Sequence, residues 1–101
     1  MSVYLMLTTL TDEGRKSLQE NPDFLKEVNK EVEHLGVKIL SQYALLGQYD
    51  FVNILEAPSD EVIAKLAIRL SAGGGMHTMT LAAIPIEGLI ATLKEKKSTP
   101  W

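Results

Sequence analysis

Cysteine is absent from the 101 residues of this sequence. Its absence excludes disulfide bonds, thiolate catalysis and cysteine-bound metals, and it fits a reducing compartment. Long apolar runs are absent too, since no stretch approaches the roughly 20 residues of a membrane-spanning helix. The first residues carry no basic stretch ahead of an apolar one, so we expect no secretory signal. We therefore predict a cytoplasmic protein that does not associate with membranes.

Positive charge is scarce as well, with 10 Lys and Arg residues against 13 Asp and Glu and a formal net charge of −3. Nucleic-acid binding needs a basic surface, so we expect no nucleic-acid partner. Only two histidines occur, far apart in the sequence. We therefore expect no metal site, and no motif indicates a bound cofactor.

The remaining composition is that of a globular domain, because 46% of the residues are hydrophobic and 23% are charged. This balance excludes a disordered chain. A chain of this length usually forms one domain. We predict a single domain over residues 1–93, followed by a charged and frayed tail over residues 94–101.

Four segments have the alternation or the apolar content of β-strands: residues 3–10, 37–46, 51–57 and 76–84. In the first strand, Val3 and Leu5 lie on one face, and Tyr4 and Met6 lie on the other. Gly47 lies in a short turn between the second and third segments, which therefore predict a hairpin.

Two amphipathic helices separate these strands. Asn21 and Pro22 predict the start of the first, because asparagine caps helices well and proline fits the first helical position. Gly36 is expected to end it with a left-handed conformation. Its apolar stripe consists of Leu25, Val28, Val32 and Leu35. Ser59 is expected to cap the second helix.

Two further segments complete the predicted order of elements. Residues 11–14 predict a loop or a short capped turn, and the apolar residues Leu89, Ile90 and Leu93 predict a short C-terminal helix. The whole order predicts an α+β, ferredoxin-like βαββαβ fold. In this fold both long helices cover one face of a four-stranded antiparallel sheet.

The other sheet face is expected to be apolar as well, because most of the predicted strands carry apolar residues on both sides. A soluble monomer rarely exposes such a patch. Pairing with a second copy of the same sheet would bury it, so we predict a homodimer or higher oligomer. The alternative is that the short C-terminal helix folds back over this face.

The hairpin sequence from Tyr43 to Pro58, YALLGQYDFVNILEAP, resembles the GYD-domain family, which is named after its Gly, Tyr and Asp. Residues 4–8, 78–81 and 83–85 are similar to that family too. The resemblance implies a ferredoxin-like subunit of the dimeric α/β-barrel class. Relatives of this architecture include cofactor-independent monooxygenases, haem-handling enzymes, isomerases and ligand-sensing domains, so the fold alone selects none of these activities.

His77 departs from the pattern that the resemblance implies, because an arginine would be expected at this position of the fourth strand. If relatives use that arginine to bind an anion, the corresponding site here is weaker or pH-dependent. A strand histidine can act as an acid, a base or a ligand. The simpler interpretation is an exposed or hydrogen-bonded side chain.

The hairpin turn supplies two further candidate site residues, Tyr49 and Asp50. Turn chemistry alone explains Gly47 and Asp50, and Tyr49 then packs as a half-buried aromatic residue. The functional alternative is that Tyr49 and Asp50 line the mouth of a pocket, as an acid and the group that orients it.

Asn53 shares a strand face with the apolar residues Phe51 and Leu55. A buried amide needs a partner. Asn53 therefore predicts either a pocket residue pointing between two sheets, or a polar ladder to the next strand. We place Tyr43 and His77 beside it as candidate lining residues, together with Met6 and Met79.

These residues support three functional hypotheses. We favour an oligomeric protein that binds a small ligand between its sheet and helices, or at a subunit junction, without chemistry of its own. The second is a cofactor-independent monooxygenase or an isomerase, in which His77 or Asp50 acts as the base and Tyr49 or Asn53 holds an enolate oxygen. The third is a structural or adaptor subunit without a pocket.

Overall fold

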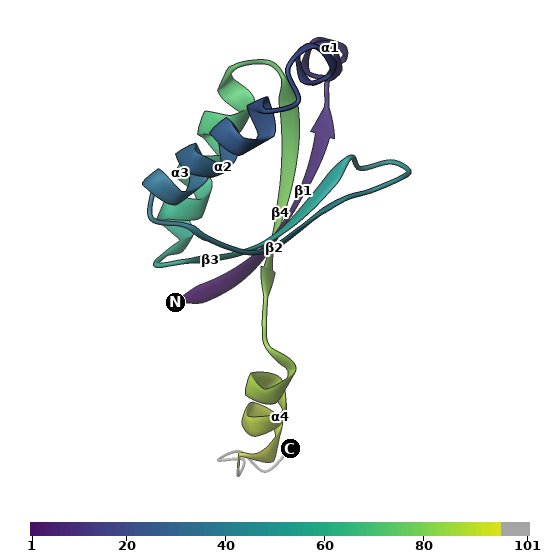
Figure 1. Ribbon diagram of the computed structural model, residues 1–101. Coiled ribbons are helices and arrows are strands. Elements are labelled where there is room, and N and C mark those ends of the chain that lie inside the picture. The colour runs from purple at the N-terminus through teal and green to yellow at the C-terminus, as the bar shows by residue number, and fades with distance from the viewer. Residues whose placement is uncertain (96–101) are drawn as a thin grey trace.

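The computed structural model describes residues 1–95. These residues form one antiparallel sheet with the strand order β2-β3-β1-β4, and helices α2 and α3 lie on one of its faces (Figure 1). The elements are β1 (Ser2–Leu10), α1 (Asp12–Glu20), α2 (Phe24–His34), β2 (Lys38–Ala44), β3 (Phe51–Ala57), α3 (Asp60–Ala72), β4 (Met76–Ala83) and α4 (Ile86–Lys94). The predicted ferredoxin-like α+β fold is confirmed. Residues 96–101 of the predicted tail lie outside the described residues.

Helix α1 is a correction to the sequence prediction, which placed a loop or a short turn at its start. The Thr11 side chain caps it by accepting a hydrogen bond from the Gly14 N–H at 3.1 Å. Asn21 lies at the end of this helix, and α2 begins at Phe24 after Asp23. The predicted helix start at Asn21 and Pro22 is therefore wrong, because Asn21 already follows another helix.

The predicted end of α2 at Gly36 and the predicted cap of α3 at Ser59 are confirmed, whereas Lys94, predicted to begin the tail, is the last residue of α4. Gly36 follows α2 with a φ of 87°, and Gly47 in the hairpin turn has a φ of 132°, both in the region that favours glycine. The Ser59 hydroxyl accepts a hydrogen bond from the Val62 N–H at 3.3 Å at the start of α3.

A bulge in β2 changes which of its residues face the helices. Ile39 pairs with Leu55, but Ser41 pairs with Ile54, so Leu40 is an extra residue in the ladder. Strict alternation would put Ile39 and Tyr43 on one face. The bulge instead places Tyr43 on the opposite face and brings Gln42 beside Asn53.

The core lies between the sheet and helices α2 and α3. Met6, Leu55 and Leu66 are almost fully buried there, at 1%, 2% and 0% exposure. The Tyr4 hydroxyl donates a hydrogen bond to the Asp60 carboxylate at the start of α3. This bond, together with burial, raises the pKa of the Tyr4 phenol above its usual value. Strand β1 is thereby fixed to α3.

The opposite, helix-free face of the sheet is apolar at its centre, as the sequence predicts. Leu5 on β1 pairs with Ile54 on β3 and with Leu81 on β4, and all three side chains lie on this face. Leu81 is 49% exposed. No described residue of the same chain forms a helix over this face.

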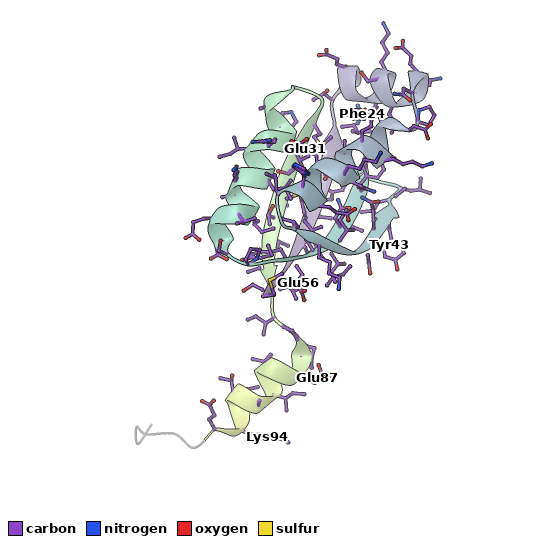
Figure 2. All side chains as sticks on the ribbon, turned by 60° about the vertical axis from the view of Figure 1, so that its left-hand side comes forward. Phe24, Glu31, Tyr43, Glu56, Glu87 and Lys94 are labelled. Carbon is purple, nitrogen blue, oxygen red and sulfur yellow. The ribbon has the colours of Figure 1, made fainter. Side chains whose placement is uncertain are left out.

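Helix α4 does not fold back over the helix-free face, so this alternative is wrong for the single chain. All of its residues are exposed, and Figures 1 and 2 both show it extending away from the sheet beyond the end of β4. Among residues 1–95, no helix is long and apolar enough to cross a membrane.

Candidate functional site

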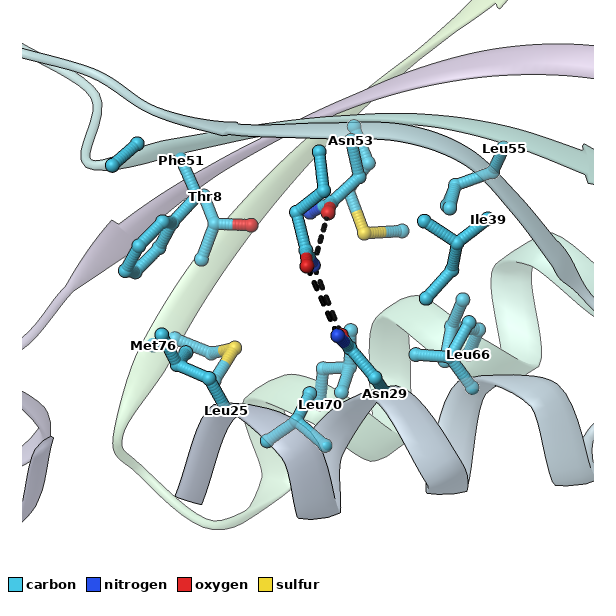
Figure 3. A pocket seen from close by; sticks show the side chains of 15 residues that line it. Thr8, Leu25, Asn29, Ile39, Phe51, Asn53, Leu55, Leu66, Leu70 and Met76 are labelled. Atoms are coloured by element: carbon cyan, nitrogen blue, oxygen red, sulfur yellow. Dashed lines mark hydrogen bonds between the residues drawn. The ribbon is translucent and has the colours of Figure 1, made fainter. Parts of the chain in front are cut away.

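A pocket of about 220 Å³ opens between the sheet and helices α2 and α3. Figure 3 shows side chains from both layers pointing into it. Its apolar walls come from both helices and from the strands: Met6, Leu25, Val28, Val32, Ile39, Ala44, Phe51, Leu55, Leu66, Leu70 and Met76. The polar members are Thr8, Asn29, Gln42 and Asn53. Such a mostly apolar lining with a few polar groups is typical of small-molecule sites.

Three amide side chains form a connected cluster on one side of this pocket. The Gln42 amide nitrogen donates to Asn53 Oδ1 at 2.7 Å and to Asn29 Oδ1 at 2.9 Å. Asn29 Nδ2 donates back to Gln42 Oε1 at 3.0 Å. The cluster therefore joins α2 to β2 and β3, as the dashed lines in Figure 3 show. These amides satisfy one another in part and keep spare donor and acceptor capacity.

None of the residues that line this pocket carries an ionisable side chain. General acid–base catalysis requires a titratable group within hydrogen-bond reach of the reacting atoms. Within the described part of the chain, no three His, Asp or Glu side chains come together as a metal site would require. The chemistry available from the lining itself is hydrogen bonding by neutral groups and apolar contact.

The structure separates the residues that the sequence analysis grouped together. Asn53 lines the pocket, but it points toward the helices and not toward a second sheet. Tyr43 pairs with Val52, and His77 pairs with Thr9, so both lie on the helix-free face. Met79 lies on that face as well. The proposed grouping of Tyr43, His77 and Met79 around Asn53 is therefore wrong.

Tyr49 also belongs to the helix-free side. Its hydroxyl donates to the sulfur of Met79 at 3.9 Å, and Met79 pairs with Leu7 on that face. Tyr43, Tyr49 and His77 therefore have the sheet between them and the amide cluster. They cannot share a ligand with Asn53 in one subunit.

The Asp50 carboxylate contacts the end of β1 and the start of α1. Its Oδ2 accepts a hydrogen bond from the Leu10 N–H at 2.7 Å, and its own N–H donates to the Thr8 carbonyl at 2.8 Å. Arg15 on α1 lies 3.6 Å from the same Oδ2. This side chain thus joins the hairpin to the end of β1 and the start of α1, which favours a structural role.

We expect Asp50→Ala to lower the free energy of unfolding by about 2 kcal/mol, because the Leu10 N–H loses a charged acceptor at a partly buried position. Asp50→Asn should recover most of this loss, since an amide oxygen can still accept. Arg15→Ala should lower the free energy of unfolding by only about 0.5 kcal/mol or less, because the Arg15 side chain is half exposed and lies 3.6 Å from the carboxylate. Urea denaturation at fixed protein concentration measures all three. An Asn variant as unstable as the Ala variant would contradict this assignment.

Asn29 is a polar pocket residue that was not among the predicted site residues. Its place on the apolar face of α2 could have been predicted from the sequence, because Leu25, Asn29 and Val32 fall at i, i+4 and i+7. A polar residue on that stripe faces the core side and needs a partner. Gln42 supplies it.

The chain is similar to known proteins in sequence and in fold. The family model of the GYD domain matches residues 4–93. A Thermus thermophilus protein named glutamine synthetase and cystathionine beta-lyase binding protein is 47% identical over 95 residues, covering 93% of this chain and 100% of that protein. The solved structure of the Mycobacterium tuberculosis leucine response regulatory protein LrpA matches with a TM-score of 0.56 at 17% identity, covering 83% of this chain. The chain spans 51% of that regulator's length, and this likeness concerns the fold alone.

Proposed function

This chain belongs to the GYD-domain family, and on that premise we propose that it is a self-associating binding protein without catalysis of its own. It holds a small neutral ligand in the pocket between the sheet and helices α2 and α3. The observation that carries this proposal is the pocket lining, which combines apolar walls with the amides Asn29, Gln42 and Asn53 and offers no ionisable group.

The lining indicates the chemical class of the ligand. The lining offers no counter-charge to a charged group, so burying such a group in the pocket is unfavourable. A planar neutral group that both donates and accepts, such as a carboxamide, can join the amide cluster. The size suits a compact ligand, because a cavity of ~150 Å³ holds benzene and this pocket has about 220 Å³.

Benzamide is a suitable probe for this site. We expect it to bind with a dissociation constant of about 1 mM, and to shift the side-chain amide resonances of Asn29, Gln42 and Asn53 in NMR titrations. Benzoate and benzylamine, which have the same ring but carry a charge, should bind at least about tenfold more weakly. Asn53→Leu should weaken benzamide binding about tenfold, because one amide partner is lost.

Gln19→Leu is the matched control, since Gln19 lies on the exposed surface of α1 outside the pocket. It should leave benzamide binding unchanged. Benzamide shifts that fall outside the pocket, or equal binding by wild type and Asn53→Leu, would reject the pocket as the ligand site.

Self-association is supported by the apolar centre of the helix-free face, where Leu5, Ile54 and Leu81 lie side by side. A two-fold axis would make this patch complementary to itself. Tyr43, Tyr49 and His77 lie on the same side, so in this arrangement they belong to the subunit junction. The monooxygenase or isomerase alternative would have to place its base there, and not in the pocket.

Protein binding is the second candidate function, and two observations favour it. The Thermus relative is named as a binding protein for two enzymes. On this chain, Ile68 is 70% exposed in a shallow groove on the outer side of α3, which Lys65 and Arg69 also line. If benzamide fails to bind, and purified glutamine synthetase co-sediments with the wild type but not with Ile68→Glu, this second function replaces the first.

A further inference from the structure

Helix α4 carries an apolar stripe that has no partner among the described residues of its own chain. Its members lie at i, i+3, i+4 and i+7: Ile86, Leu89, Ile90 and Leu93. Their exposures are 63%, 43%, 44% and 74%. Figures 1 and 2 show the helix separated from the sheet in two views. A nine-residue helix is marginal in water without tertiary contacts, so α4 needs a surface to pack on.

The dimensions of the chain indicate how much surface is left uncovered. Its radius of gyration is 16.6 Å, whereas a compact domain of 100 residues has ~13 Å. Its accessible surface is 7336 Å², whereas a folded monomer of this mass exposes about 5,700 Å². The excess is therefore roughly 1,700 Å².

The described residues must account for a substantial part of this excess. Even a fully extended chain with the mass of residues 96–101 exposes only about 1,000 Å². About 700 Å² of excess remains for the rest of the chain, close to the ~800 Å² that each partner buries in a standard protein interface. The uncovered area is thus of the size that a stable partner would bury.

We propose that α4 is an arm exchanged between two copies of this chain. The α4 helix of one copy packs at the margin of the helix-free sheet face of the second copy, and the second copy's α4 packs on the first in the same way. This inference rests on the self-association proposed above. Exposed apolar residues follow one another along the sequence, from Met79 and Leu81 on β4 through Ile84 to the stripe of α4. Every copy brings both the arm and the surface that receives it, so the contact is reciprocal.

Intermolecular paramagnetic broadening tests where α4 lies. The chain has no cysteine, so Thr92→Cys gives a unique attachment point for a nitroxide label on an exposed residue. Protein that carries this label but no ¹⁵N is mixed with an equal amount of ¹⁵N wild type. Any broadening of the ¹⁵N protein then comes from a label on the other copy, and we expect it to be stronger at amides of the strands than at those of α2 and α3.

A charge on the stripe provides the second readout. Ile90→Asp should raise the dissociation constant of the self-association about tenfold or more, as measured by sedimentation. Ala91→Asp adds the same charge to the same helix away from the stripe, and it should change that constant less than about twofold. Both residues are exposed, so neither change should disturb the fold, which amide spectra can verify.

Each result decides between the two proposals. Strand broadening together with a selective loss in Ile90→Asp supports the exchanged arm. A dimer without intermolecular broadening, or one that tolerates Ile90→Asp, overturns the arm but leaves self-association intact. A wild-type monomer at tens of micromolar overturns both.

Discussion

Replacing Gly14 by alanine is expected to destabilise the fold by about 3 kcal/mol. A Cβ atom at this position would lie 1.9 Å from the Gly75 carbonyl oxygen, which is backbone and cannot rotate away. That oxygen accepts a hydrogen bond from the Thr11 N–H at 3.0 Å, so moving it also breaks the link between α1 and the start of β4. Alanine improves helix propensity by only ~1 kcal/mol. The clash therefore prevails.

The matched control is Gly73→Ala, in the turn before β4. Gly73 has a φ of −77°, and no atom lies within 4 Å of its added Cβ. Gly73→Ala should change the free energy of unfolding by no more than about 0.5 kcal/mol. Thermal unfolding can be followed by circular dichroism at one fixed protein concentration. The melting temperature of Gly14→Ala should be roughly 15 °C below that of the wild type. Equal melting temperatures for the two variants would mean that α1 does not pack against this turn.

Replacing Leu81 by aspartate should weaken self-association about a thousandfold. Leu81 is 49% exposed, so the single chain tolerates the charge, but a partner covering this face would bury it. A two-fold axis places two such carboxylates in one interface, and at ~2 kcal/mol for each buried group the total is about 4 kcal/mol. Sedimentation or light scattering over a range of concentrations measures the shift.

Leu46→Asp is the control for this change. Leu46 is fully exposed in the hairpin turn, outside the strands, and its variant should associate like the wild type. If Leu81→Asp and Leu46→Asp behave alike, the helix-free face is not the interface. Retained association in Leu81→Asp would then direct attention to other exposed surfaces, such as the outer side of α3.

Period-2 alternation was sufficient to predict the two faces of β1, β3 and β4. The ladder is regular in these strands. Met6 therefore pairs with Asn53, and both side chains face the helices, as the alternation along each strand predicts. Alternation failed in β2, where the bulge at Leu40 exchanges the faces of the residues that follow. A bulge has no fixed sequence pattern, and this one moved Tyr43 out of the predicted site.

Helix α1 could not be predicted from hydrophobic periodicity, because Leu18 is the only large apolar residue in Asp12–Glu20. Its position depends on tertiary contacts. Thr11 Oγ1 donates to the Gly74 carbonyl at 2.8 Å, and Gly14 approaches Gly75, 61 residues away in sequence. Such pairings between distant segments leave no local pattern in the sequence.

The place of β1 in the sheet has a consequence for how the protein is made. This strand is synthesised before its neighbours β3 and β4, and the pairing of Leu5 with Leu81 spans most of the chain. Until β4 has emerged from the ribosome, one edge of this apolar strand stays open to other nascent chains. The sheet is therefore complete only after the last strand has been made, and long-range pairing of this kind slows folding. One edge of β1 therefore stays without its partner strand until residues 76–83 have been translated.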